Sequence, residues 1–264
     1  MPLQYILGTQ PFGKDLNILC KKNVLIPRWE TDEICTFIND VLLKKRFEKL
    51  EKEQKLKKVI VDLCTGSGCM SLSIKETYFN VKNLHVYGID VSKPCITLSN
   101  DNQKFNNLEN DKGKGETWLG YVLNDALNPS KELINRLREK NEWSSVLNVD
   151  SKSNAPFIEC LISNPPYIPS SRLSQLNVSV KNYEPHKALF GDLQFYQNFV
   201  DVWSNYSNSF FYELGESSQY ECIKTGLNPN QWIVNKWIDG NDNLRGVYGY
   251  RKHLQNDYEH YINN

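Results

Sequence analysis

Residues 59–68 read VIVDLCTGSG, a short apolar run that ends in a turn rich in glycine. β-Branched residues favour extended chain, so we expect a buried strand over Val59–Leu63. The next stretch, Met70–Tyr78, has the apolar pattern of a helix. Glycines between a strand and a helix let the backbone approach a ligand closely, while the helix amino terminus presents N–H groups to it. This stretch therefore predicts a strand, a ligand-binding turn and a helix.

The chain after residue 58 repeats this alternation of short apolar runs and helical patterns, which is typical of parallel strands joined by crossover helices. We expect a Rossmann-like α/β fold with a mostly parallel sheet of seven strands. The last two strands follow each other without a helix between them, so they should form an antiparallel edge. The seven expected strands are Val59–Leu63, Leu84–Ile89, Trp118–Leu123, Phe157–Ser163, Ser209–Leu214, Gln231–Trp237 and Arg245–Arg251.

The segment before the sheet has a different pattern. Gln4–Leu19 consists of short extended segments broken by glycines and a proline, and a helix should follow over Thr31–Phe47, with Thr31 as its N-cap. We expect residues 1–30 to form a β-hairpin cap and residues 31–264 to form the main domain.

Composition excludes several classes of protein. The chain has 264 residues with 31 basic and 31 acidic side chains, so its formal net charge of +0 gives no sign of a polyanionic partner. The seven cysteines form no CxxC pair and the four histidines have no metal-ligand spacing, so we expect neither disulfides nor a metal. No apolar run is long enough to span a membrane. Two polar stretches, Asn106–Glu116 and Glu139–Pro156, should be surface loops.

An acidic residue, Asp90, ends the second expected strand. A carboxylate at such a strand tip can accept hydrogen bonds from both hydroxyls of a ribose, and the carboxyl ends of parallel strands meet at one edge of a sheet. The turn has the spacing D-x-x-x-G-x-G from Asp62 to Gly68, and the chain has neither G-x-G-x-x-G nor a phosphate-binding loop. This pattern favours S-adenosylmethionine over NAD or ATP, although a glycine pair alone is also compatible with a purely structural turn.

The fourth expected strand runs into Asn164-Pro165-Pro166-Tyr167. Prolines have no N–H donor, so this corner offers acceptors: the side-chain oxygen of Asn164 and the backbone oxygen of Pro165 can receive the two hydrogens of a planar NH2 group. Tyr167 supplies a flat face beside that group. Hydrogen bonds that strengthen as the nitrogen becomes pyramidal would stabilise methyl transfer without a strong general base. The structural alternative is a Pro-Pro strand breaker.

With these motifs, the chain resembles the HemK/PrmC-type release factor glutamine methyltransferases, including their mitochondrial counterparts. The resemblance covers nearly the whole chain. The Asn-Pro-Pro-Tyr corner is shared with amino-methyltransferases acting on adenine, whereas the segment Ile26–Thr31 distinguishes the glutamine enzymes. Other matching segments are Gln4–Gly8 with Phe12, the glycine turn, Tyr183–Pro185 with Ala188 and Leu189, Glu213–Gly215 with Gln219, and Arg245–Val247.

The resemblance implies a class I S-adenosylmethionine-dependent methyltransferase, with residues 31–264 as its catalytic domain. Its implied substrate is the glutamine amide in the Gly-Gly-Gln motif of a class I peptide chain release factor, a protein of translation termination. The residues implied to bind the cofactor are Asp62, Cys64, Thr65, Gly66, Ser67, Gly68, Asp90, Asp125 and Asn164. Those implied to bind the substrate are Phe12, Arg28, Glu30, Asn164, Pro165, Pro166 and Tyr167, with Asn164, Pro165 and Tyr167 as the catalytic group.

Three features depart from the family pattern. Cys64 stands where the family has the first glycine of the turn, which a negative φ there would accommodate. Trp29 replaces the usual proline between Arg28 and Glu30, and the helical domain that precedes the Gln4 segment in the family is not in the sequence. We therefore expect a catalytic domain separated from that helical domain.

The resemblance and the Asn- and Lys-rich insertions favour the mitochondrial matrix, with the cytoplasm as the alternative location. We expect a monomer that binds no nucleic acid directly. The alternative function is an adenine N6 methyltransferase acting on DNA or RNA, which would need a basic track and base flipping.

Overall fold

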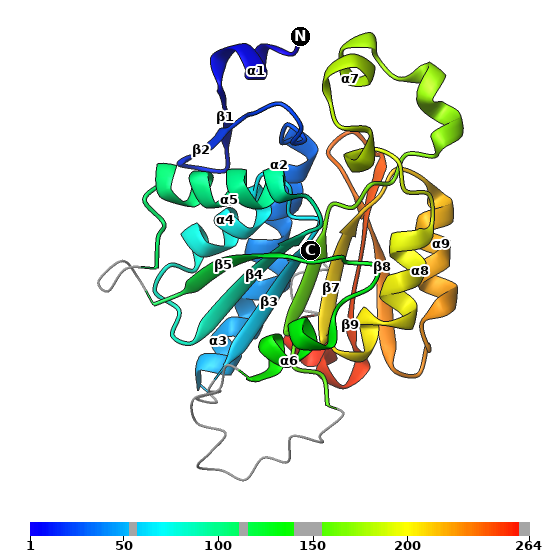
Figure 1. Ribbon diagram of the computed structural model, residues 1–264. Coiled ribbons are helices and arrows are strands. Elements are labelled where there is room, and N and C mark those ends of the chain that lie inside the picture. The colour runs from blue at the N-terminus through cyan, green and yellow to red at the C-terminus, as the bar shows by residue number, and fades with distance from the viewer. Residues whose placement is uncertain (53–56, 111–115, 140–154, 259–264) are drawn as a thin grey trace.

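The computed structural model describes residues 1–52, 57–110, 116–139 and 155–258. A seven-stranded sheet runs through the molecule in the order β5-β4-β3-β6-β7-β9-β8, with helices on both faces (Figure 1). β9 runs antiparallel to both of its neighbours, β7 and β8, and the other strand pairs of this sheet are parallel. The strands are β3 (Lys58–Leu63), β4 (Leu84–Asp90), β5 (Trp118–Leu123), β6 (Cys160–Ser163), β7 (Ser209–Glu213), β8 (Trp232–Ile238) and β9 (Leu244–Arg251).

The expected sheet and its antiparallel edge are confirmed, and all strand bounds but one agree with the expectation to within one residue. The exception is the fourth strand, which begins at Cys160 rather than Phe157. The backbone N–H groups of Phe157 and Ile158 both donate to the oxygen of Tyr206, so this segment contacts a loop and joins no continuous ladder.

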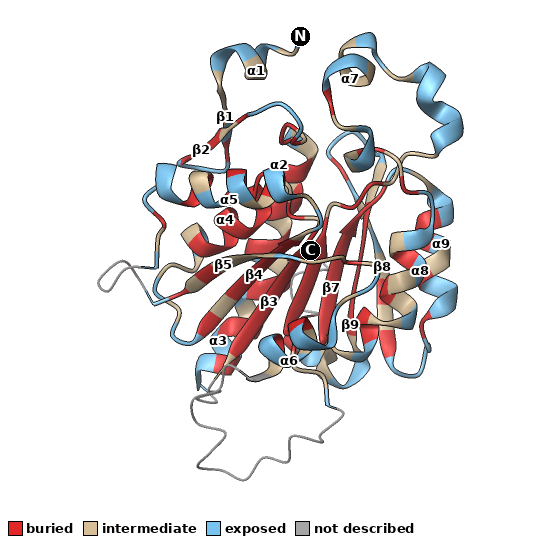
Figure 2. Ribbon diagram, in the orientation of Figure 1, coloured by how far each residue is buried: buried red, intermediate tan, exposed pale blue. Residues whose placement is uncertain are grey.

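Helices cover the two faces of the sheet and divide the core in two. On one face lie α2 (Trp29–Phe37), the π-helix η1 (Ile38–Leu43), α3 (Lys44–Lys52) and α4 (Cys69–Thr77). The other face is covered by α6 (Lys131–Glu139), α8 (Gln194–Asp201) and α9 (Ser217–Gly226). Ile60 of β3 belongs to the first cluster and Val61 to the second, because successive side chains of a strand point to opposite faces. Every residue of β3 is buried, as Figure 2 shows.

The amino-terminal segment forms α1 (Leu3–Leu7) and then the hairpin of β1 (Thr9–Phe12) and β2 (Leu16–Leu19). The hairpin agrees with the expectation. The expectation of extended chain before Gly8 was wrong, because residues 3–7 form one helical turn that ends where Gly8 takes φ 80° and donates to the oxygen of Gln4. Left-handed backbone of this kind is the usual end of a helix.

The helix after the hairpin begins at Trp29, so the expectation that Thr31 caps it was wrong. Arg28 is the N-cap and makes no side-chain capping bond. Thr31 lies inside the helix and is 1% exposed, and its hydroxyl donates to Glu213. A buried hydroxyl needs a partner, and the carboxylate at the end of β7 supplies it.

The remaining helices lie mainly around the carboxyl edge of the sheet. They are α5 (Lys93–Phe105), η2 (Ser170–Gln175), α7 (Val178–Tyr183), η3 (His186–Ala188), η4 (Trp203–Asn205) and η5 (Lys252–Asp257), the last two being at the other edge. The α1 and α7 segments rise above the carboxyl edge (Figure 1). Residues 111–115 of the first expected loop, Asn106–Glu116, and 140–154 of the second, Glu139–Pro156, lie outside the described residues. Within the described part of the chain, no helix combines the length and apolar character needed to cross a membrane.

Candidate active site

The glycine turn follows β3, the strand at which the direction of chain progression across the sheet reverses. Ligands of open α/β sheets bind at this switch point. The N–H of Thr65 donates to the oxygen of Ile89 on β4 (3.0 Å), and the N–H of Gly66 donates to the Asp90 carboxylate (3.0 Å). The turn is thereby tied to the neighbouring strand tip, and the expected association of the turn with Asp90 is present.

Asp62 lies beneath the turn and holds it from inside. Its Oδ2 accepts hydrogen bonds from the hydroxyls of Thr65 (2.6 Å) and Ser71. Its Oδ1 is buried and accepts none from the described residues. Burial raises the pKa of Asp62 to about 6. Asp62 therefore shapes the turn from below.

Cys64 does not meet the condition set by the sequence, since its φ is +59°. This is the left-handed region, where the Cβ of an L-residue crowds the backbone and glycine is preferred. Cys64 retains the backbone of the glycine it replaces at the cost of strain. Gly66 and Gly68 have positive φ values as well, 56° and 82°.

Ser67 and Gly68 are held by α5 and β5. The backbone oxygen of Ser67 accepts a hydrogen bond from Asn102 Nδ2 (2.9 Å). The other end of the same amide, Asn102 Oδ1, accepts a hydrogen bond from the N–H of Leu19 in the hairpin. A Cβ at Gly68 would lie 2.6 Å from the Tyr121 hydroxyl, so a side chain has no room there. The turn is thus packed from behind, and the amino terminus of α4 follows it directly.

The strand tips beside the turn fit a nucleoside. Each oxygen of the Asp90 carboxylate accepts one backbone hydrogen bond, from Gly66 (3.0 Å) and Ser92 (2.8 Å), which leaves further lone pairs for two hydroxyls. The Cβ position of Gly66 has no atom nearer than 3.9 Å, so space is open there. Asp125 follows β5, where its carboxylate accepts from the N–H of Leu127 and the amide of Asn128.

The Asn-Pro-Pro-Tyr corner follows β6, the strand that pairs with β3 on the side opposite β4. Its backbone is packed against two glycines. A Cβ at Gly191 would lie 2.1 Å from the oxygen of Pro166, and one at Gly215 would lie 2.8 Å from the ring of Tyr167. The backbone oxygen of Tyr167 accepts from Gln219 Nε2 (2.7 Å). These contacts hold the corner rigidly beside the glycine turn.

Side chains from three elements meet at this corner. Asn164 Nδ2 donates to the hydroxyl of Thr31 (3.1 Å), and that hydroxyl donates to Glu213 Oε2 (3.0 Å). The hydroxyl of Tyr167 donates to Glu213 Oε1 (3.2 Å). Asn164 Oδ1 accepts no hydrogen bond from the described residues, so it remains available to a ligand.

Glu213 is 2% exposed and ends β7. Burial raises the pKa of Glu213 to about 7, against the lowering effects of the hydrogen bonds from Thr31 and Tyr167. The cation of Arg245 also lowers this pKa, whereas Glu30 raises it. A group that changes charge near neutral pH thus lies directly behind Asn164 and Tyr167.

Comparison with known proteins gives relatives that span most of the chain. No family profile matches. The mitochondrial MRF1 N(5)-glutamine methyltransferase MTQ1 of Saccharomyces cerevisiae is 32% identical over 261 residues, which are 95% of this chain and 71% of that protein. The release factor glutamine methyltransferase of Thermodesulfovibrio yellowstonii is 30% identical over 237 residues, or 86% of this chain and 70% of that protein.

The chain belongs to the release factor glutamine methyltransferase family. The resemblance inferred from the motifs is thereby confirmed. Among solved structures, a human methyltransferase 10 domain containing protein covers 86% of this chain and 85% of its own, with a TM-score of 0.50 at 14% identity. That likeness supports the fold of a class I methyltransferase.

For this family member, the remaining candidate residues lie around the mouth of the corner. The guanidinium of Arg28 donates to both oxygens of Glu184 at 2.6 Å, so it joins the start of α2 to the end of α7. Glu30 lies 3.8 Å from Arg245. Phe12 is 2% exposed and belongs to the apolar core. In this structure these three side chains contact the protein, and none of them joins the hydrogen-bond network of Asn164.

Three residues in the machinery of this methyltransferase were not among the sequence candidates. Glu213 and Gln219 contact the corner from β7 and α9, and Asn102 joins the glycine turn to the hairpin. The signals available for Glu213 were a carboxylate at the end of the apolar run Phe210–Tyr212 and the match of Glu213–Gly215 to the family pattern. Nothing in the local pattern around Asn102 marks it.

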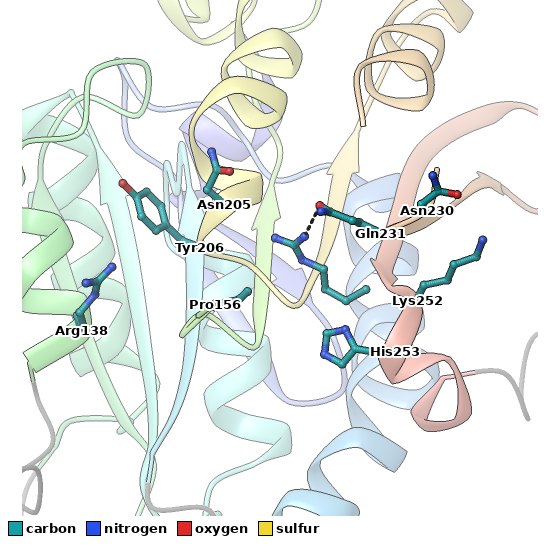
Figure 3. A pocket seen from close by; sticks show the side chains of 9 residues that line it. Arg138, Pro156, Asn205, Tyr206, Asn230, Gln231, Lys252 and His253 are labelled. Atoms are coloured by element: carbon teal, nitrogen blue, oxygen red, sulfur yellow. Dashed lines mark hydrogen bonds between the residues drawn. The ribbon is translucent and has the colours of Figure 1, made fainter. Parts of the chain in front are cut away.

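A cavity of about 700 Å³ lies elsewhere, at the amino ends of β6, β7 and β8 (Figure 3). Its lining includes the cationic side chains of Arg138, Arg251 and Lys252, together with His253. It is therefore at the edge opposite Asn164. A smaller cavity of about 430 Å³ adjoins Gly215 and Arg172, beside the Tyr167 corner.

Proposed function

We propose that this chain transfers a methyl group to the side-chain amide of a glutamine in the Gly-Gly-Gln motif of a class I release factor. Membership of the family supports the reaction. The observation that carries it in this chain is the hydrogen-bonded Asn164, whose amide nitrogen is anchored on Thr31 and whose oxygen accepts nothing from the described residues. An acceptor of this kind suits an NH2 group.

The methyl donor is S-adenosylmethionine, the cofactor of this fold, and it supplies an electrophilic methyl group. In our assignment, the turn residues Cys64, Thr65, Gly66, Ser67 and Gly68 would hold its methionine portion, Asp62 would support that turn from beneath, and Asp90 would accept hydrogen bonds from its ribose hydroxyls. Asp125 lies next to Asp90, since the N–H of Asn124 donates to the oxygen of Asp90. This proximity supports a role for Asp125 in holding the cofactor. Asn164 is shared between cofactor and substrate because β6 adjoins β3.

The protein's own part in the reaction is positioning. The oxygens of Asn164 and Pro165 accept the two hydrogens of the glutamine amide, and these bonds strengthen as the nitrogen loses its planarity. The ring of Tyr167 and the backbone of Pro166 hold the amide plane. The methylated amide is acidic and loses its proton to water, so the chain needs no strong base. Holding the nitrogen in line with the methyl group accounts for most of the rate.

The test is methyl transfer from labelled S-adenosylmethionine to a purified class I release factor. Label should enter the wild-type release factor and be absent from a Gln→Ala variant of its Gly-Gly-Gln motif. Equal labelling of the two would disprove the assignment. DNA and RNA oligonucleotides containing adenine serve as the second substrate class, and their labelling would favour the adenine N6 alternative. The basic cavity lies at the far edge from Asn164, which does not favour that alternative.

We also propose that the chain works in the mitochondrial matrix; the name of the yeast relative calls that protein mitochondrial. We propose that the chain acts there as a monomer and that its partner is the release factor itself. Fractionation of cells carrying the tagged chain, with protease protection of intact mitochondria, tests the location. Tagged chain found only in the cytosolic fraction would contradict it.

A further inference from the structure

The network behind Asn164 has a defined direction. Glu213 uses both carboxylate oxygens as acceptors, one for Thr31 and one for Tyr167. A hydroxyl has a single proton. Because Thr31 gives its proton to Glu213, its lone pairs face Asn164 and can receive only the NH2 end of that amide.

The direction matters because an amide has two different ends of nearly the same shape. With its nitrogen on Thr31, Asn164 turns its oxygen away from the network, toward the substrate side. The reverse arrangement would present an NH2 group to the NH2 of the substrate, and two donors repel each other. The substrate side cannot select the correct end before substrate arrives, so the selection has to come from behind.

We propose that Glu213 and Thr31 are positioning residues that determine which end of the Asn164 amide faces the substrate. The proposal rests on the proposed function, because it assigns these side chains a role in that same reaction. Ionised Glu213 accepts the Thr31 proton and holds the productive orientation. Protonated Glu213 can donate to Thr31, which then donates to Asn164 and reverses the amide.

The surroundings of Glu213 support a change of its charge near neutral pH. Burial raises its pKa to about 7. The titratable side chains that face it come from five elements: Glu30 of α2, Cys69 of α4, Tyr167 after β6, Tyr196 of α8 and Arg245 of β9. Only Arg245 among these is a cation, and it also binds Asp239 at 3.2 Å.

The first experiment measures kcat of release factor methylation at saturating cofactor and substrate. Glu213→Gln keeps the shape but can donate a proton to Thr31, and it should lower kcat about tenfold or more, less than the ~10²-fold expected for removing Asn164. Thr31→Val should act similarly, and Thr31→Ser should restore the hydroxyl and the rate. Thr36→Val is the matched control, because Thr36 lies on the same helix and its hydroxyl bonds only to the oxygen of Asp32.

A double-mutant cycle separates positioning from a general structural role. If Glu213 acts through Asn164, Glu213→Gln should cost almost nothing in kcat when Asn164 is already alanine. Additive losses in the Asn164→Ala, Glu213→Gln double variant would overturn the proposal. The affinity for S-adenosylmethionine, measured by calorimetry, should be the same in the Glu213→Gln, Thr31→Val and Thr31→Ser variants as in the wild type, and thermal unfolding shows that the variants lacking Asn164 are folded.

The pH profile is the second readout. In the wild type, kcat should fall as pH decreases through about 7, where Glu213 takes up a proton. Glu213→Gln should remove that limb while leaving any limb near 6 that belongs to Asp62. An unchanged limb near 7 in Glu213→Gln would overturn the proposal. A wild type that methylates no release factor would instead disprove the proposed function, so the two failures are distinguishable.

Discussion

Two buried glutamates lie at opposite edges of the same sheet and have opposite surroundings. Glu159 directly precedes β6 and is 1% exposed, and its Oε2 accepts from the Arg46 guanidinium (3.0 Å) and from Asn208 (3.1 Å). Glu213 ends β7 and is 2% exposed, yet its hydrogen-bond partners are the neutral hydroxyls of Thr31 and Tyr167. At Glu159 a hydrogen-bonded cation compensates the burial, whereas at Glu213 the cation of Arg245 lowers the pKa without being one of its hydrogen-bond partners.

The difference separates what stabilises the fold from what serves the reaction. A buried carboxylate paired with a guanidinium is costly to break, because the remaining charge is left alone. A buried carboxylate among hydroxyls is costly to keep ionised. Functional sites commonly retain such destabilising groups. The edge with Glu159 should therefore respond to mutation through stability, and the edge with Glu213 through turnover.

Asn164→Ala gives the largest expected effect and tests the functional edge directly. Removing the acceptor for the substrate NH2 should lower kcat by about 10²-fold or more. Single-turnover methyl transfer to the release factor measures it. Asn100→Ala, an exposed change on α5, is the control and should be neutral. Turnover within threefold of the wild type in Asn164→Ala would remove this residue from the mechanism.

A comparison of the thermal stabilities of Glu159→Gln and Glu213→Gln contrasts the two edges of the sheet. Glu159→Gln weakens the buried pair with Arg46 and should cost about 2–3 kcal/mol, lowering the Tm by roughly 5 °C or more. Glu213→Gln should be at least as stable as the wild type at pH 8, because it removes a carboxylate that is unfavourable when ionised. Thermal unfolding of both variants at pH 8 decides it. A larger loss of Tm in Glu213→Gln would invert the comparison.

The pH dependence of stability should oppose that of activity. The pKa of Glu213 is raised from 4.5 to about 7 in the folded chain, so the folded state binds the proton more tightly than the unfolded chain does. Its contribution to stability is therefore complete below about 4.5 and is lost as pH rises through about 7. Asp62 acts in the same sense up to about 6. The wild-type Tm should fall between pH 5 and 8, more than in Glu213→Gln, while kcat rises.

Cys64→Gly gives the smallest expected effect. It tests whether the functional edge contains a second destabilising feature besides the buried carboxylate of Glu213, namely the backbone strain at Cys64. Glycine adopts the φ of +59° without the Cβ conflict, so the change should add up to about 1 kcal/mol of stability. Cys222→Ala, at a residue of α9 whose backbone is helical, should give no such gain. Urea unfolding measures both. A loss of stability in Cys64→Gly would show that the side chain compensates for its backbone.

The sheet was predictable from the sequence because its strands are short apolar runs between helical patterns. Alternating burial of residues such as Ile60 and Val61 on two faces makes such runs apolar throughout. The short helix Leu3–Leu7 was not predictable from that pattern, since it has only 5 residues and none of them is buried. It depends on the left-handed Gly8 that ends it.

The site was predictable where its residues are adjacent in the sequence, as in the glycine turn and the Asn-Pro-Pro-Tyr corner. The network behind the corner was not, because Thr31 and Glu213 are 182 positions apart and only the packing of α2 against the end of β7 joins them. A threonine near the start of a helix is normally a cap, and local rules favoured that interpretation. Burial against a carboxylate overrode it.

The contact of Thr31 with Glu213 also constrains how the chain is made. The helices that precede the sheet bind residues near the other end of the chain, since Lys45 also donates to the oxygen of Asn256 and Arg46 to Asp257. At ribosomal rates of about 5–20 residues per second, these partners emerge roughly 10–40 s after the first helix. During that interval α2 and α3 lack these partners from the later part of the chain, and nascent-chain chaperones have time to bind them.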